Sequence, residues 1–297
     1  MTIFLEVVLP VLLVFSLGFV LERKSKLDIK PISTLAIYIM TPCLVFQNFY
    51  HTSIDVQIFY MLLIALILLL TLVILNKIIA YFMKIPSDRE TGFVLSTAFM
   101  NAGNYGAPII LFAFGQEGFQ FAVMFMVIQS ILMNSFGVYF ATKMKESMMY
   151  AVKMVLTMPA IWALVVAAIA KTIPLELPLA LERTTSMVSE ATIPTVMLIL
   201  GMQLAKIPLS GFEWKGITYA SIMRLFVSPL IAYGLTLLFP VDPLLANVII
   251  VLAAMPSAAN IVMFAVQFEA EPKLVSSITL VTTIISIFSI TALLVLL

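Results

Sequence analysis

The chain alternates between long hydrophobic runs and short polar segments. Ten of the runs are long enough to cross a bilayer as helices, because a hydrocarbon core of about 30 Å takes about 20 helical residues. They predict membrane helices at 3–21, 33–50, 57–82, 92–114, 119–141, 150–170, 183–204, 216–239, 244–267 and 274–296. The polar segments between the runs are too short to form a soluble domain. We therefore predict an all-α integral membrane protein of ten transmembrane helices, surrounded by membrane lipids.

The two halves of the chain carry similar features at a nearly constant spacing. Three matching pairs of positions lie 149, 152 and 155 residues apart: Pro10 and Pro159, Pro42 and Pro194, Met100 and Met255. Each half has five runs, an odd number, so the second half enters the membrane in the opposite sense to the first. We expect two inverted five-helix repeats, at 1–142 and 148–297.

Two of the runs are interrupted in the middle by helix-breaking residues, the fourth at 101–108 and the ninth at 255–260. Irregular backbone at membrane depth is tolerated only where it is buried in protein or lines a wet cavity. Paired interruptions in two repeats are the sequence sign of a transport site. We therefore expect helices 4 and 9 to be broken and to cross around one site.

Residues at the breaks are suited to hold an anion. Gly103 and Gly106 permit backbone angles that are closed to other residues, and Pro108 suits the first turn of a new helix. The positive end of such a half-helix attracts an anion, to which the Asn101 and Asn104 amides can also donate. The alternative is that the breaks are ordinary kinks and the asparagines join helices. The candidate substrate-binding residues at the breaks are Asn101, Gly103, Asn104, Tyr105, Gly106, Pro108, Pro256, Ser257 and Asn260.

Lysine and arginine are divided unevenly between alternate loops. With Arg224 set aside as a residue within a run, thirteen fall in one set of loops and two, Lys171 and Arg183, in the other. The positive-inside rule then predicts a cell (inner or plasma) membrane protein with both termini outside the cytoplasm.

Composition narrows the class further. The chain is 63% hydrophobic and 10% charged with a net charge of +1, which excludes a soluble fold and offers no basic face for nucleic acid. His51 and Cys43 are the only histidine and cysteine, so a histidine-dependent catalytic triad, an internal disulfide or a thiolate metal cluster is not expected. We expect no enzyme, no cofactor and no metal site.

A few polar residues within the runs are candidates for coupling or gating. Arg224 can counter an anionic substrate, or else snorkel to the inner surface or tie helix ends together. Glu190 can carry a proton, or else make a structural hydrogen bond near the outer surface. Neither break contains a carboxylate, so an aspartate pair is not expected to couple transport to protons. If Na⁺ rather than H⁺ is the coupling ion, backbone carbonyls can hold it together with Gln203, Gln267 or Thr and Ser hydroxyl groups.

The motifs taken together resemble the bacterial branch of the auxin efflux carrier family, relatives of the plant PIN proteins. They are Asn101-x-Gly103-x-x-Gly106-x-Pro108, Met-Pro-Ser-Ala-Ala-Asn at 255–260, and Arg224 five residues before Pro229. The resemblance covers essentially the whole chain. It places the chain among PIN-like transporters of the bile acid/arsenite/riboflavin transporter superfamily.

This resemblance implies a sodium/proton-antiporter-like fold of the elevator type. It implies a scaffold of helices 1, 2, 6 and 7, a transport unit of helices 3–5 and 8–10, and a homodimer. It also implies that the crossover asparagines bind a carboxylate, and that Gln129 and Asn134 face the substrate from helix 5. The chain has Met100 where the plant carriers have proline, and its central loop is short. The short loop means that kinase regulation is not implied. Auxin is not implied as the substrate either, because bacterial members that resemble this chain are linked to dicarboxylates such as malate or malonate as often as to indole-like compounds.

The sequence thus predicts a secondary active or potential-driven carrier for a small organic anion, a dicarboxylate or an auxin-like carboxylate. Two alternatives remain open: a sodium- or proton-coupled symporter of another small solute, and a membrane sensor or channel derived from the carrier fold.

Overall fold

The computed structural model describes residues 2–52, 55–142, 148–172, 177–208 and 211–297. Every regular element in these ranges is helical, apart from one isolated β-bridge. The prediction of an all-α membrane protein is confirmed. The proposed boundary between the repeats, 143–147, lies outside the described residues.

Seven helical segments are long and apolar enough to cross a bilayer. They are Phe4–Ser25 (η1 and α1), Ile29–His51 (α2, η2 and α3), Val56–Met83 (α4), Ala102–Ala141 (η3, α6, η4 and α7), Leu179–Ala205 (α10), Trp214–Leu238 (α11, η5 and α12) and Pro272–Leu296 (α15). The shorter helices are α5 (Ser87–Ala98), α8 (Met148–Leu156), α9 (Pro159–Thr172), α13 (Pro243–Ala253) and α14 (Ala259–Gln267).

The longest of these segments is two helices rather than one. Within α6 (Ala107–Leu132), Gly115 has φ 68° and ψ −162°, a conformation that interrupts a helix and that glycine adopts readily. The sequence prediction ended one run at 114 and began the next at 119, so its division includes the same glycine.

Five short π-helical segments (η) accompany these helices. η2 (Ala36–Met40), η4 (Met133–Gly137) and η5 (Met223–Val227) lie inside longer helices, whereas η1 (Phe4–Val8) lies at the start of the first helix and η3 (Ala102–Gly106) begins the helix that follows the first break.

Several helices begin a few residues before their hydrophobic runs do. Asp28, Asp55 and Asp242 each cap a helix by accepting a hydrogen bond from the backbone N–H two residues later, at 3.0, 2.9 and 2.8 Å. These caps are polar, so a hydrophobic run does not include them.

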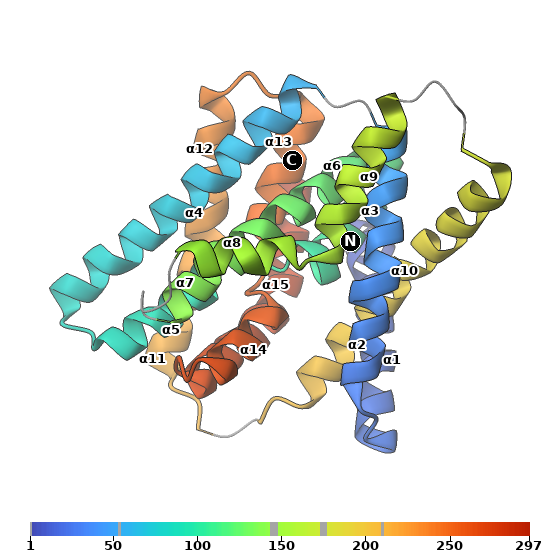
Figure 1. Cartoon of the computed structure of the whole chain (residues 1–297). Coiled ribbons are helices and arrows are strands. Elements are labelled where there is room, and N and C mark those ends of the chain that lie inside the picture. Colours follow the sequence, from blue (N-terminus) through green and yellow to red (C-terminus); the bar gives the residue numbers. More distant parts are fainter. Residues whose placement is uncertain (1, 53–54, 143–147, 173–176, 209–210) are drawn as a thin grey trace.

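The helices form two groups in space. In Figure 1, α1, α2, α3, α9 and α10 lie on one side and α4, α5, α11 and α12 on the other, with α13, α14 and α15 between. Within the first group, α1 packs along α10 and α3 packs along α9. Glycines permit the first contact: a Cβ on Gly18 would lie 2.2 Å from the Leu198 carbonyl oxygen, and one on Gly201 only 2.0 Å from that of Phe15. Such close approach through small residues is typical of membrane helices.

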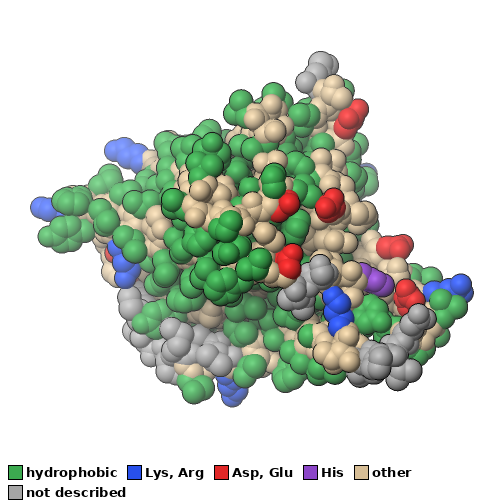
Figure 2. Space-filling view, turned by 90° about the horizontal axis from the view of Figure 1, so that it is seen from above, with side chains coloured by type: hydrophobic (Ala, Val, Ile, Leu, Met, Phe, Trp, Pro, Cys, Tyr) green, Lys and Arg blue, Asp and Glu red, His purple; other side chains and the backbone are tan. Residues whose placement is uncertain are grey.

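The outer surface is apolar, as contact with lipid requires. Phe59, Phe82, Leu237 and Phe288 are among the large hydrophobic side chains that point outward. Figure 2 shows hydrophobic side chains over much of the face seen from above, with basic groups mainly toward its edges and acidic groups near its centre and right side. In water this surface would be a large aggregation-prone patch, whereas in a bilayer it is matched to its solvent.

Candidate functional site: the crossing of two broken helices

The two interrupted helices meet at their breaks. The chain is non-helical between α5 and η3 and again between α13 and α14. Met100 and Ser257 form an antiparallel β-bridge, in which the Asn101 N–H donates to the Pro256 carbonyl at 2.9 Å. The Ala258 N–H donates to the Phe99 carbonyl at 3.0 Å. Each break therefore supplies the backbone partners that the other needs in an interior where water is excluded.

The glycines at the first break act differently from the prediction. Among the described residues, the glycines with positive φ are Gly115 and Gly211, whereas Gly106 is helical with φ −65° and ψ −50°. The expectation that Gly103 and Gly106 adopt angles closed to other residues is therefore wrong. Gly106 is needed for close packing instead, because a Cβ there would lie 2.5 Å from the Leu252 side chain of α13. A Cβ on Gly103 would lie 3.0 Å from Met126 Sδ.

A cavity of about 940 Å³ opens beside the crossing. It is lined from both breaks and from α2, α6, α10, α14 and α15. Eight of the residues singled out from the sequence line it: Asn101, Gly103, Asn104, Gln129, Asn134, Gln203, Asn260 and Gln267. Residues more than 150 positions apart in the chain are thus brought to one volume.

Two side-chain donors in this cavity are left without a partner. Asn101 and Gln129 are each only 5% exposed, and neither Asn101 Nδ2 nor Gln129 Nε2 has a hydrogen-bond partner in the described part of the chain. A buried donor without an acceptor costs about 1–3 kcal/mol. Asn134 differs, because its Nδ2 donates to the Ser130 carbonyl of its own helix at 2.9 Å. The fully buried free donors in the described residues of the cavity therefore come from the first break and from α6.

The remaining candidate residues at the breaks, Tyr105, Gly106, Pro108, Pro256 and Ser257, do not line the cavity. Ser257 is fully buried, and its hydroxyl accepts a hydrogen bond from Thr279 Oγ1 at 3.2 Å. The ring of Tyr105 packs edge-on against Phe15 of α1. Gly106, Pro108 and Pro256 shape the backbone of the crossing.

The two charged candidates within the membrane also lie away from the cavity lining. Glu190 is on an exposed face of α10, where its carboxylate accepts a hydrogen bond from Ser186 at 3.1 Å. Arg224 is fully buried and does not snorkel to the surface. Its guanidinium donates to the Thr97 carbonyl at 2.6 Å, and also to the Ala253 carbonyl and the Ser228 hydroxyl.

The lining also includes hydroxyl groups that were not singled out from the sequence. Ser276 and Thr279 of α15 line the cavity. Their spacing gave a usable signal, because positions three or four apart share one face of a helix. Buried hydroxyl groups at 276, 279, 282, 283 and 286 form such a stripe.

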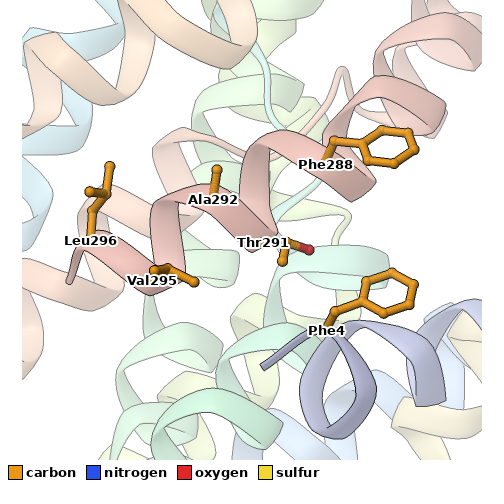
Figure 3. A pocket seen from close by; sticks show the side chains of 6 residues that line it. All are labelled: Phe4, Phe288, Thr291, Ala292, Val295 and Leu296. Atoms are coloured by element: carbon orange, nitrogen blue, oxygen red, sulfur yellow. The ribbon is translucent and has the colours of Figure 1, made fainter. Parts of the chain in front are cut away.

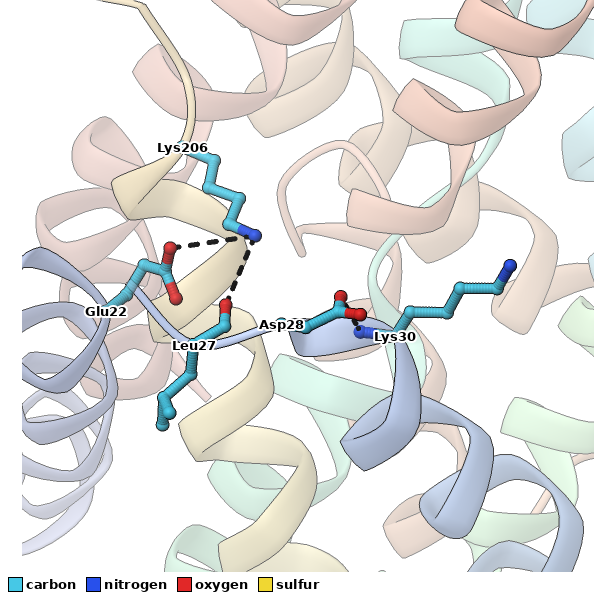
Figure 4. A network of polar contacts seen from close by, with 5 residues as sticks. All are labelled: Glu22, Leu27, Asp28, Lys30 and Lys206. Carbon is cyan, nitrogen blue, oxygen red and sulfur yellow. Dashed lines mark hydrogen bonds and ion pairs between the residues drawn. The ribbon is translucent and has the colours of Figure 1, made fainter. Parts of the chain in front are cut away.

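Charged residues gather at the mouth of the cavity. Lys30, Lys206, Lys273 and Asp28 all line it. Lys206 is held in place, since its Nζ lies 3.6 Å from Glu22 Oε1 and donates to the Leu27 carbonyl at 3.4 Å. Figure 4 shows this pair on one side of Asp28 and the Lys30 side chain extending away from it. The mouth is therefore more basic than the depth of the cavity, where the polar groups are amides and hydroxyls.

A second hollow has no comparable chemistry. It measures about 570 Å³ and lies between the start of η1 and the end of α15, where it is lined by Phe4 and by Phe288, Thr291, Ala292, Val295 and Leu296 (Figure 3). Among the described residues, Thr291 is the one polar residue that lines it, and its hydroxyl donates to the Ile287 carbonyl of its own helix at 2.7 Å. It offers no group that recognises a polar solute.

Comparison with known proteins places the chain in a family. The family described as "Membrane transport protein" matches residues 3–154 and 144–294, which together span nearly the whole chain. The chain belongs to this auxin efflux carrier family. It is therefore a multi-pass membrane transporter and not an enzyme, and the resemblance inferred from the motifs is confirmed.

Similar proteins come from archaea and bacteria. The chain is 28% identical to an uncharacterized transporter of Methanothermobacter thermautotrophicus over 292 residues, which are 96% of this chain and 95% of the relative. It is 26% identical to an uncharacterized transporter of Methanocaldococcus jannaschii over 298 residues, 95% of each chain. A candidate malonate transporter of Rhizobium meliloti is 29% identical over 120 residues, 40% of this chain and 37% of that protein.

Proposed function

We propose that this transporter is a carrier for a small organic anion, with a dicarboxylate such as malonate as the first substrate to test. The observation that carries the proposal is the pair of buried, unpartnered amide donors, Asn101 Nδ2 and Gln129 Nε2, in the cavity beside the crossing. A carboxylate oxygen is the acceptor that both lack. The partial relative named for malonate transport supports the same class of substrate.

The helix ends at the crossing favour the same charge. The half-helices η3–α6 and α14 both begin at the cavity, and Asn101, Gly103, Asn104 and Asn260 of their starts line it. First-turn N–H groups lack intrahelical acceptors, and the helix dipole adds positive potential there. Amides and helix ends can together hold an anion without a buried cation in the cavity. Because these donors carry no full charge, the anion can also leave, as a carrier requires.

The cavity opens on one side of the membrane. Lys30, Lys206 and Lys273 line its mouth, and all three belong to the set of loops that the charge distribution assigns to the cytoplasm. On that assignment the structure corresponds to an inward-open state. Its volume of about 940 Å³ is near the upper end of the range for ligand pockets, which leaves room for water around a small anion.

The packing supports two inverted five-helix repeats that move as an elevator. In this scheme α1 corresponds to α9 and α3 to α10, and the contact of α1 with α10 has its counterpart in the contact of α9 with α3. Likewise α4 corresponds to α12 and α5 to α13, and the contact of α4 with α5 has its counterpart in that of α12 with α13. In this scheme helices 1, 2, 6 and 7 are the scaffold, and the crossing moves with helices 3–5 and 8–10.

Substrate counterflow in proteoliposomes tests the proposal. Vesicles loaded with unlabelled malonate should accumulate labelled malonate with saturable kinetics, and Asn101→Ala should lower the affinity. Asn247→Ala is a matched control, because Asn247 lies on α13 outside the cavity lining. Conductance without counterflow would indicate a channel, and transport only of solutes without a carboxylate would contradict the proposal.

A further inference from the structure

Arg224 is a buried cation without a carboxylate partner in the described residues. It lies in η5 and is 0% exposed. The hydrogen bonds of its guanidinium go to two backbone carbonyls and one hydroxyl, those of Thr97, Ala253 and Ser228. A buried charge normally requires a partner of opposite sign. The partners that Arg224 does have must therefore supply the negative potential that stabilises it.

Those carbonyls lie at the C-terminal ends of the two half-helices. Thr97 is in the last turn of α5, which ends at Ala98, and Ala253 is the last residue of α13. Carbonyls in the last turn have no intrahelical donor and carry the negative end of the helix dipole. One guanidinium thus joins the C-terminal ends of the first half-helices, α5 and α13, while the second half-helices, η3–α6 and α14, begin at the cavity.

The surrounding groups fix this arrangement. Ser228 Oγ also donates to the Ala253 carbonyl, at 2.9 Å. The hydroxyl of Thr97 accepts a hydrogen bond from Asn76 Nδ2 at 2.8 Å, and the Asn76 Oδ1 accepts one from the Tyr219 hydroxyl at 2.9 Å. Helices α4, α5, α11, α12 and α13 are tied together at this point.

Carriers with broken helices place a coupling cation at this kind of position, where half-helix C-terminal ends and unwound carbonyls supply oxygen ligands. We propose that the Arg224 guanidinium takes the place of a coupling Na⁺ ion at the crossing. The proposal rests on the carrier function proposed above and extends it to the coupling. A covalently attached cation stays with the moving unit, so transport of the anion proceeds without Na⁺.

The first test uses the unaltered protein. Its melting temperature in detergent and its malonate counterflow rate are measured in NaCl, KCl and choline chloride at equal ionic strength. We expect the same melting temperature in all three salts and rates that agree within about a factor of two. Stabilisation by Na⁺ alone, or acceleration by more than about ten-fold in an inward Na⁺ gradient, would overturn the proposal.

The second test removes the guanidinium. Arg224→Ala leaves the Thr97 and Ala253 carbonyls facing an empty cation position, so the melting temperature of this variant should be lower than that of the parent. Adding Na⁺ or low millimolar guanidinium should raise it again, whereas choline or urea should not. Arg89→Ala is the control, because Arg89 pairs with Glu213 at the surface and its loss should create no cation dependence. An Arg224→Ala protein that folds but gains no such dependence would contradict the proposal.

Arg224→Lys covers the case in which the alanine variant does not fold. It keeps a cation at the same place and should remain insensitive to Na⁺, whereas Na⁺-dependent stability in this variant would count against the proposal. The melting arms need no substrate. If the unaltered protein transports no organic anion, the proposed function fails, yet the melting temperatures still decide the role of Arg224.

Discussion

At the scale of single residues, the polar groups at and near the cavity are of two kinds: some are hydrogen-bonded within the protein, and others have a donor free to bind a ligand. The Ser257 hydroxyl and the Pro256 carbonyl accept hydrogen bonds at the crossing, and Asn134 donates to its own helix. Asn101 and Gln129 keep donors that no described residue accepts from. Mutations at the second kind of position should therefore change binding more than stability.

Asn101→Ala and Gln129→Ala should each weaken malonate binding by about 1.5–3 kcal/mol, the range for a hydrogen bond to a charged group. Because the donors have no partner in the empty protein, the melting temperature without substrate should stay within a few degrees of that of the parent. Calorimetric titration alongside thermal melting separates the two effects.

Asn101→Asp sharpens this test by placing a like charge at the site, so it should weaken binding of an anion more than Asn101→Ala does. Asn247→Ala serves as the matched control and should leave affinity unchanged. If Asn101→Asp and Gln129→Ala both bind malonate as well as the parent, the carboxylate site lies elsewhere.

At the scale of elements, the contact between α1 and α10 depends on two glycines. In the helix Leu179–Ala205, a Cβ at Gly201 would lie 2.0 Å from the Phe15 carbonyl oxygen, a backbone atom that cannot rotate away. The two helices would have to separate to admit a methyl group. Overpacking of this kind typically costs about 1–3 kcal/mol.

Gly201→Ala should therefore lower the melting temperature clearly. Gly234→Ala is the control within the same protein, because Gly234 lies inside α12 and a methyl group added there would have no heavy atom of another residue within 4 Å, apart from its own helix backbone and chain neighbours. There the substitution should be neutral or stabilising by about 0.5–1 kcal/mol, since alanine favours a helix over glycine. Equal melting temperatures for the two variants would show that the glycine contact does not limit packing.

The elements also show what a sequence can and cannot predict here. Hydrophobic runs coincide with each of the seven segments that are long and apolar enough to cross a bilayer, and clusters of Gly, Pro and Asn located both breaks. The predicted run at 150–170, in contrast, is divided between α8 and α9. The hydrogen bonds between Asn101 and Pro256 and between Ala258 and Phe99 join residues far apart in the chain, so no local pattern specifies them. The role of Gly106 was misjudged for the same reason, because the Leu252 side chain that excludes a Cβ lies on another helix.

At the scale of the whole molecule, an elevator requires a scaffold that stays still while the transport unit moves. In the proposed scheme, α1, α2, α3, α9 and α10 form this scaffold, and a second copy of the chain anchors it. We expect a homodimer with scaffold helices at the interface. Native mass spectrometry from membranes checks this, and a monomer that retains transport would contradict it.

Orientation is the second property of the whole molecule, and it decides which side the cavity faces. Ser25 is exposed at the end of α1 in a basic loop, and Thr172 is exposed at the end of α9 in the opposite set of loops. In a Cys43→Ala background, Thr172→Cys should react with an impermeant maleimide in intact cells, and Ser25→Cys only after permeabilisation. The physical reason is the thirteen-to-two excess of Lys and Arg in the loops on the Ser25 side, which resist transfer across the membrane. Labelling of Ser25→Cys from outside would reverse the topology, and the basic mouth with Lys30, Lys206 and Lys273 would then receive its anion from the exterior.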